Sequence, residues 1–170
     1  MKTLKSFTSV FVVLLSVVLT AAAQTNLTAL DGSRVNIEGQ NGKIVILAVG
    51  ASWLPLSGKQ VDYTNALAKK YAGKNVAIYF VTTDSSNPKS KNYATVEAMQ
   101  KWAFSNKISV PVLYDPDGLG TLKKFRIEQV PSFVVLDKYG ALVGQPFGGL
   151  DPDPRHDITA PISRVVDKLL

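Results

Sequence analysis

Two uninterrupted apolar runs constrain the fold of this chain more than any other feature. They span residues 43–49 and 75–81, and both are rich in β-branched side chains. A strand that is buried on both faces shows such a run without polar alternation. Residues 57–72 lie between the two runs and carry apolar residues near helical spacing. The pattern predicts a strand–helix–strand unit, which places two parallel strands in one central sheet.

The remaining segments extend this α/β pattern. The predicted elements are a hairpin over 27–37 with Asp31-Gly32 as its turn, a helix over 91–106, a strand over 110–114, a short helix over 119–125, strands over 133–137 and 141–145, and a helix over 158–170. Asp-Gly between two apolar runs is a strong hairpin signal. We therefore expect an α/β fold with a central mixed sheet flanked by helices and an N-terminal β-hairpin.

The first 23 residues predict a secretory signal peptide. Lys2 and Lys5 precede an apolar run over 7–20, and Ala21-Ala22-Ala23 then supplies an A-x-A cleavage site. The run is shorter than the roughly 20 residues that a membrane-spanning helix needs. We expect cleavage near Ala23, no stable membrane anchor afterwards, and release of one domain, residues 24–170, to the periplasm or beyond the cell.

Composition and charge exclude several classes of function. The formal net charge is +6, but the basic residues are scattered and do not interleave with aromatic ones, so we expect no nucleic-acid partner. Three carboxylates, Asp151, Asp153 and Asp157, have calcium-like spacing. The glycine and terminal glutamate of an EF-hand loop are missing. We expect neither a metal ion nor a cofactor.

Residues 51–57 carry a resemblance to a known family. They read Ala-Ser-Trp-Leu-Pro-Leu-Ser at the passage from a predicted strand into a helix. The segment resembles the W-C-x-x-C motif of the thioredoxin superfamily in its TlpA-like or redoxin branch, which commonly reads A-S-W-C-P-x-C. Leu54 and Ser57 stand at the two cysteine positions. Asp84, the Asp-Pro-Asp-Gly turn at 115–118 and the Val-Pro-Ser-Phe segment at 130–133 are also similar to that branch.

The resemblance implies a thioredoxin-like fold and, in most members, a periplasmic thiol–disulfide reductase. None of the 170 residues of this chain is a cysteine. Disulfide exchange requires a thiolate that attacks a sulfur atom, and Leu54 has no ionisable group. We therefore expect no catalytic residue of the family's kind, and the same absence excludes a peroxidatic cysteine.

Ser57 has two interpretations. As a replacement nucleophile it would need an adjacent base, and the single histidine, His156, lies far away in the sequence. As a helix start, Ser57-Gly58-Lys59-Gln60 fits a capping box, in which serine and glutamine bond each other's backbone N–H groups. The sequence favours the capping box.

The resemblance also places a cis-proline at Pro131, opposite residues 53–57. In this fold Val130 would then offer its backbone to an extended peptide by strand addition. Trp53 either packs beside the segment at the cysteine positions or binds a ligand. Pro131 is present either because the fold needs a backbone bend there or because it forms part of a peptide-binding groove. The candidate binding residues are Trp53, Leu54, Pro55, Leu56, Val130 and Pro131.

Three functional hypotheses follow from these residues. The first is a redox-inactive module that docks a protein or peptide partner in the cell envelope. The second is a thiol–disulfide oxidoreductase by ancestry that acts only with a cysteine-bearing partner. The third, which the sequence supports least, is a different enzyme that uses Ser57 or His156.

Overall fold

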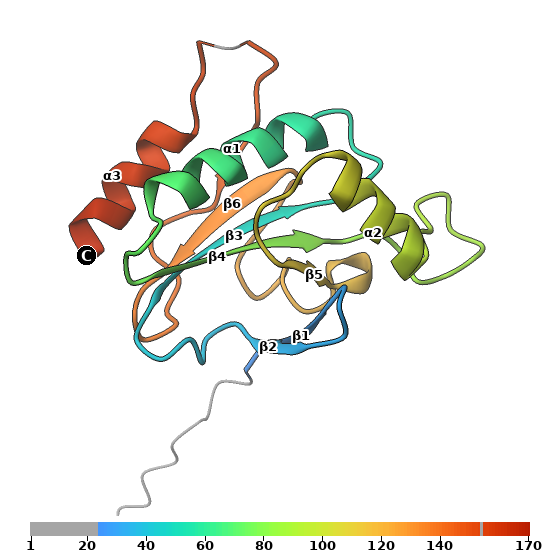
Figure 1. Ribbon diagram of the computed structural model, residues 1–170, viewed down its shortest axis with the longest axis horizontal. Coiled ribbons are helices and arrows are strands. Elements are labelled where there is room, and N and C mark those ends of the chain that lie inside the picture. Colours follow the sequence, from blue (N-terminus) through green and yellow to red (C-terminus); the bar gives the residue numbers. More distant parts are fainter. Residues whose placement is uncertain (1–23, 154) are drawn as a thin grey trace, which may run out of the picture.

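The computed structural model describes residues 24–153 and 155–170 and has the predicted α/β architecture. Its seven-stranded sheet has the order β2-β1-β5-β4-β3-β6-β7, with helices packed above it (Figure 1). The predicted signal peptide lies outside the described residues and stays a prediction. Within the described part, no helix is long and apolar enough to cross a membrane.

The elements follow one another in an alternating α/β order. Their bounds are β1 Asn26–Ala29, β2 Arg34–Asn36, β3 Ile44–Gly50, α1 Ser57–Lys70, β4 Val76–Thr82, α2 Val96–Ser105, β5 Val112–Tyr114, the 3-10 turn η1 Pro116–Gly118, β6 Ser132–Leu136, β7 Phe147–Gly148 and α3 Thr159–Leu169.

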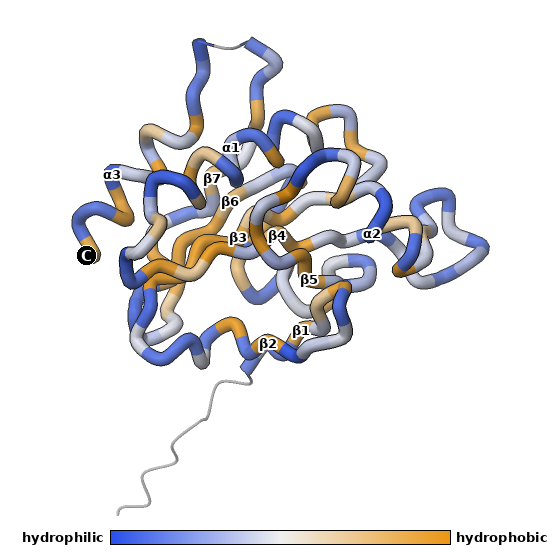
Figure 2. The backbone as a smooth tube through the Cα atoms, in the orientation of Figure 1, coloured by the Kyte–Doolittle hydropathy of each residue, from blue (hydrophilic) through white to orange (hydrophobic). Residues whose placement is uncertain are grey.

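The strand–helix–strand unit forms the centre of the molecule, as the two apolar runs predicted. β3 and β4 are parallel and pair in continuous register from Ile44 opposite Val76 to Gly50 opposite Thr82. Every residue of β3 is buried. Figure 2 shows these central strands in the colours of the hydrophobic end of the scale.

The sheet is mixed because strands of opposite direction flank the parallel centre. β6 runs antiparallel to β3, and β7 runs antiparallel to β6. On the far side, β5 is parallel to β4 and antiparallel to β1. β1 and β2 form the predicted N-terminal hairpin. The predicted fold class is therefore confirmed.

Different parts of the chain cover the two faces of the sheet. One face carries a core to which α1 contributes Val61 and Leu67 and α3 contributes Ile162 and Val166. Trp102 of α2 reaches the same core, where its ring centroid lies 5.5 Å from that of Phe80. The opposite face packs against the N-terminal hairpin and against Phe125 and Ile127.

The predicted helix over 119–125 is wrong, because this segment forms consecutive turns. The Asp115 carboxylate accepts hydrogen bonds from the backbone N–H groups of Gly120, at 2.8 Å, and Thr121, at 2.9 Å. The Asp115 side chain, which follows β5, thus accepts the N–H groups that would start a helix and holds the segment in turns.

Two other predicted elements have different bounds. The helix predicted over 91–106 begins only at Val96, because the Thr95 hydroxyl accepts a bond from the Ala98 N–H at 3.1 Å and caps it. Tyr93 therefore precedes the helix. The strand predicted over 141–145 is reduced to a single bridge between Leu142 and Leu136. Gly144, with a φ of 71°, breaks the extended backbone before β7.

We expect Phe80→Ala to lower the free energy of unfolding by about 3 to 5 kcal/mol, because it leaves a cavity in the core. Phe80 is fully buried, whereas Phe104 is 86% exposed. Phe104→Ala is thus a matched control and should change stability by less than about 0.5 kcal/mol. Urea denaturation followed by circular dichroism measures both, and equal losses would contradict this description of the core.

Candidate functional site

The segment 51–57 connects the carboxyl end of β3 to the first turn of α1. Ala51 is buried, and Trp53 is 48% exposed. Leu54 and Leu56 are half-buried, and Pro55 is exposed. The segment therefore presents a largely apolar surface to solvent, and this surface stands where a strand ends and a helix begins.

The pairing of β3 with β6 brings Val130 and Pro131 to this segment. Val49 lies opposite Ser132 in an antiparallel register. Residues that follow Val49 and residues that precede Ser132 therefore leave the same end of the two strands. The Val130–Pro131 peptide bond is cis. All six candidate binding residues thus come from two adjacent loops at one end of the sheet.

The Gln60 side chain connects these two loops through hydrogen bonds. The sequence did not predict this role. Its side chain is fully buried. The amide nitrogen donates to the carbonyl oxygen of Val49 at 3.1 Å and to that of Ser132 at 3.0 Å. One side chain of α1 thereby holds the ends of β3 and β6 together. The sequence signal that could have indicated this role is the spacing of Gln60 and Thr64, two polar residues one helical turn apart. Both are buried in α1.

The predicted capping box is wrong for the same reason. The amide of Gln60 is engaged with the strands, and the Ser57 hydroxyl donates to the carbonyl oxygen of Ala51. Leu56 is the N-cap residue and supplies no side-chain bond. The serine stabilises the bend into the helix by bonding backwards along the chain.

The hypothesis that pairs Ser57 with His156 finds no support in the structure. Ser57 is buried. His156 pairs with Asp151, whose carboxylate oxygen lies 2.8 Å from its Nδ1 atom. Among the described contacts, neither side chain touches the other. A serine nucleophile needs a base within hydrogen-bond reach, so this arrangement cannot activate Ser57.

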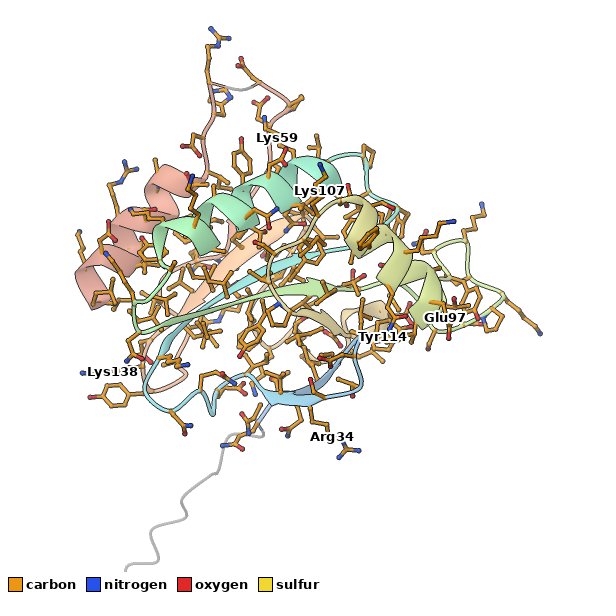
Figure 3. The ribbon with its side chains drawn as sticks, in the orientation of Figure 1. Arg34, Lys59, Glu97, Lys107, Tyr114 and Lys138 are labelled. Atoms are coloured by element: carbon orange, nitrogen blue, oxygen red, sulfur yellow. The ribbon has the colours of Figure 1, made fainter. Side chains whose placement is uncertain are left out.

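The loop that contains His156 rests on α1 through Lys59. The Lys59 ammonium group donates to the carbonyl oxygens of Asp151, at 2.5 Å, and Asp153, at 3.2 Å. Figure 3 shows Lys59 pointing from α1 toward this loop. The loop is thus attached to the first turn of α1, close in sequence to segment 51–57.

The three carboxylates with calcium-like spacing each have a local partner. Asp151 pairs with His156, Asp153 with Arg155, and Asp157 accepts from Thr159 at its helix start. Hydrogen bonds from Arg155 lower the pKa of Asp153. The described residues contain no group of three or more His, Asp or Glu side chains that could hold a metal ion.

Asp84 shapes the beginning of the site. Its buried carboxylate accepts from the Ser52 N–H at 2.9 Å, from the Ser52 hydroxyl at 2.5 Å and from the Thr82 hydroxyl. These bonds fix Ser52, and with it the direction in which Trp53 leaves the sheet. Asp84 therefore acts as a positioning group of the scaffold.

Residues 18–145 match the model of the AhpC/TSA family, which covers most of the chain. The chain belongs to this family. The resemblance to the redoxin branch of the thioredoxin superfamily is thereby confirmed, and it includes the segment in which Leu54 and Ser57 replace cysteine.

Similar proteins agree with this assignment. Thiol-disulfide oxidoreductase ResA of Bacillus thuringiensis (strain Al Hakam) is 26% identical over 121 residues, which are 71% of this chain and 64% of ResA. The chain thus spans less than two thirds of the length of that relative.

Solved structures share the fold. The pneumococcal exposed lipoprotein thioredoxin Etrx1 of Streptococcus pneumoniae strain TIGR4 has a TM-score of 0.68 and 24% identity, with 86% of this chain and all of that chain covered. A thiol:disulfide interchange protein DsbE from Chlorobium tepidum has a TM-score of 0.70 and 20% identity, with coverage of 88% and 95%.

Residues 54–57 form a turn whose ends are close enough for a disulfide. The Ser57 N–H donates to the carbonyl oxygen of Leu54 at 3.1 Å. Such a turn brings its first and fourth Cα atoms within about 7 Å, and a disulfide spans about 4.4 to 6.8 Å between Cα atoms. Two cysteines at these positions could therefore join without a change of fold.

We expect the Leu54→Cys/Ser57→Cys variant to form an intramolecular disulfide under mild oxidation. Thiol titration in denaturant should detect free thiols before oxidation and none after it, with the protein still monomeric on a non-reducing gel. Leu54→Cys alone is the control and should retain its thiol or form dimers. Persistent free thiols in the double variant would show that the backbone has lost the redox geometry.

Proposed function

We propose that this chain is an exported, redox-inactive member of the AhpC/TSA family that binds a protein or extended peptide. The binding surface is the relic face, which comprises Trp53, Leu54, Pro55, Leu56, Val130 and Pro131. It binds without forming or breaking a disulfide, because Leu54 and Ser57 provide no thiolate.

One observation carries the proposal: an exposed apolar cluster lies beside backbone groups that have no partner. Neither the N–H nor the carbonyl group of Val130 forms a hydrogen bond with the described residues. Unpaired backbone groups at the edge of a strand bind extended peptides by strand addition. The same chain segment that ends β6 can therefore bond a ligand's main chain.

The apolar part of the relic face supports binding energetically. Trp53 is 48% exposed, and tryptophan is enriched among residues that dominate binding energy. Leucine at position 54 enlarges the apolar area relative to a cysteine, and full burial of a leucine side chain contributes about 1.5 to 3 kcal/mol. Loss of the thiol thus removes the chemistry while it strengthens apolar contact.

The export part of the proposal rests on residues 1–23 and on the relatives. Lys2, Lys5, the apolar run over 7–20 and Ala21-Ala22-Ala23 fit a cleaved signal peptide. One structural relative is described as an exposed lipoprotein thioredoxin. We place the mature domain, residues 24–170, in the periplasm or outside the cell.

Affinity capture from the native cell envelope tests the binding proposal. The mature domain serves as bait beside a Trp53→Ser/Val130→Asp variant, and mass spectrometry quantifies the bound proteins. We expect the variant to lose a partner by at least about tenfold, which corresponds to about 1.4 kcal/mol, because it disrupts both the apolar anchor and the peptide-bonding segment.

A second variant controls for a general loss of apolar surface. Phe104 and Leu119 are 86% and 83% exposed and lie outside the relic face. Phe104→Ser/Leu119→Asp therefore makes the same kind of change elsewhere and should retain the partner. Equal capture by wild type and the Trp53/Val130 variant would refute docking through the relic face.

Family membership favours a second candidate, an oxidoreductase component that works only beside a cysteine-bearing partner. For the isolated chain we expect no reduction of insulin by dithiothreitol above a blank without protein, because it cannot form the mixed disulfide. Turbidity of precipitating insulin chains measures the rate. Acceleration by the isolated chain would overturn its redox inactivity.

A further inference from the structure

A polar cavity is lined by Gln129 and Ser132, the residues on either side of the Val130–Pro131 pair. It is open to solvent and has a volume of about 680 Å³, and its polar side chains come from Arg126, Glu128, Gln129, Ser132 and Gln145. Gln129 and Ser132 flank the Val130–Pro131 pair directly in the sequence. The cavity is therefore immediately beside the proposed peptide-binding segment.

Sheet order fixes the relative positions of the two surfaces. β6 lies between β3 and β7. Ser132 pairs with Val49 on one side and with Gly148 on the other. The apolar part of the relic face follows β3, whereas the polar cavity borders Gly148 of β7. A peptide bonded to Val130 would thus have an apolar surface on one side and a polar cavity on the other.

Gln129 and Ser132 pack closely against Gly148, which has no side chain. A Cβ atom there would lie 2.8 Å from the amide nitrogen of Gln129 and 3.0 Å from the hydroxyl of Ser132. Glycine at this position lets both polar groups line the space. The Ser132 hydroxyl is already engaged with the carbonyl oxygen of Gln129 at 2.6 Å.

The groups left for a ligand are two amides and one pair of opposite charges. The side chains of Gln129 and Gln145 are exposed and form no hydrogen bonds with the described residues. Arg126 and Glu128 are exposed and form no ion pair within the described part. A charged ligand side chain would meet both an opposite and a like charge. An uncharged side chain that both donates and accepts can pair with the amides.

We propose that the polar cavity selects the ligand of the relic face: an extended peptide that carries an uncharged hydrogen-bonding residue, Asn, Gln, Ser or Thr, close to an apolar anchor residue. The inference rests on the proposed function, because the peptide must first bind at Val130. Trp53 and Leu54 receive the apolar anchor, and Gln129 and Gln145 bond the polar side chain.

An array of acetylated decapeptides tests the selection. Each peptide has a Phe-Leu anchor in an alanine background, and all residues except cysteine are scanned at each position on either side. We expect Asn, Gln, Ser and Thr to bind wild-type protein about threefold to tenfold better than Leu at one position near the anchor, the range expected for one or two hydrogen bonds.

Gln129→Leu/Gln145→Leu should abolish or reverse this preference and keep the dependence on the anchor. Both residues are exposed, so the variant should fold. Gln100→Leu, the same change at an exposed glutamine of the α2 helix, should keep the preference.

The outcomes separate the two proposals. Anchor-dependent binding that Trp53→Ser weakens, without preference for uncharged polar residues, overturns the selection and leaves the proposed function standing. Enrichment of acidic or basic residues also overturns the selection, because the charge of Arg126 or of Glu128 would then determine which residue binds. If no peptide binds in a Trp53-dependent manner, the selection is overturned, whereas the affinity capture described above decides whether a protein partner docks on the relic face.

Discussion

The antiparallel pairing of β3 with β6 is the interaction on which the site depends. It places the loop after Val49 and the loop before Ser132 at the same end of the sheet. Gln60 then bonds the carbonyl groups of both residues from within the core. A buried side chain with two such bonds is costly to replace, because an apolar residue would leave the carbonyl oxygens unpaired. The two loops thus keep their relative position without any contribution from cysteine.

Because these bonds do not involve cysteine, the fold of the site does not depend on a redox pair. The supports of the site are Gln60 beneath it, Asp84 at Ser52, and the Ser57 bond to Ala51. None of them requires a sulfur atom. Replacement of the cysteine positions by Leu54 and Ser57 removes the nucleophile and leaves the surface and the unpaired backbone of Val130.

The sequence predicted the parts of the fold that local patterns determine. The apolar runs specified β3 and β4 because a doubly buried strand needs a continuous apolar segment. The sequence pattern failed where side-chain hydrogen bonds to the backbone, rather than apolar spacing, decide the local structure. Asp115 bends residues 119–125 into turns, and Thr95 starts α2 later than the helical spacing indicates. For the site, the six candidate residues stay a prediction, and the structure places them in two adjacent loops. Gln60 was assigned to a cap, because sequence alone does not show that its amide meets strands 11 and 72 residues away.

Site-specific photo-cross-linking in intact cells tests the central claim most directly. A benzophenone amino acid replaces Leu54 in the full chain, and a matched protein carries it at Phe104, which is more exposed. The account predicts a discrete cross-linked adduct from position 54 and none from position 104, since a partner lies on the relic face. No adduct at position 54, or the same adduct at both positions, would contradict it.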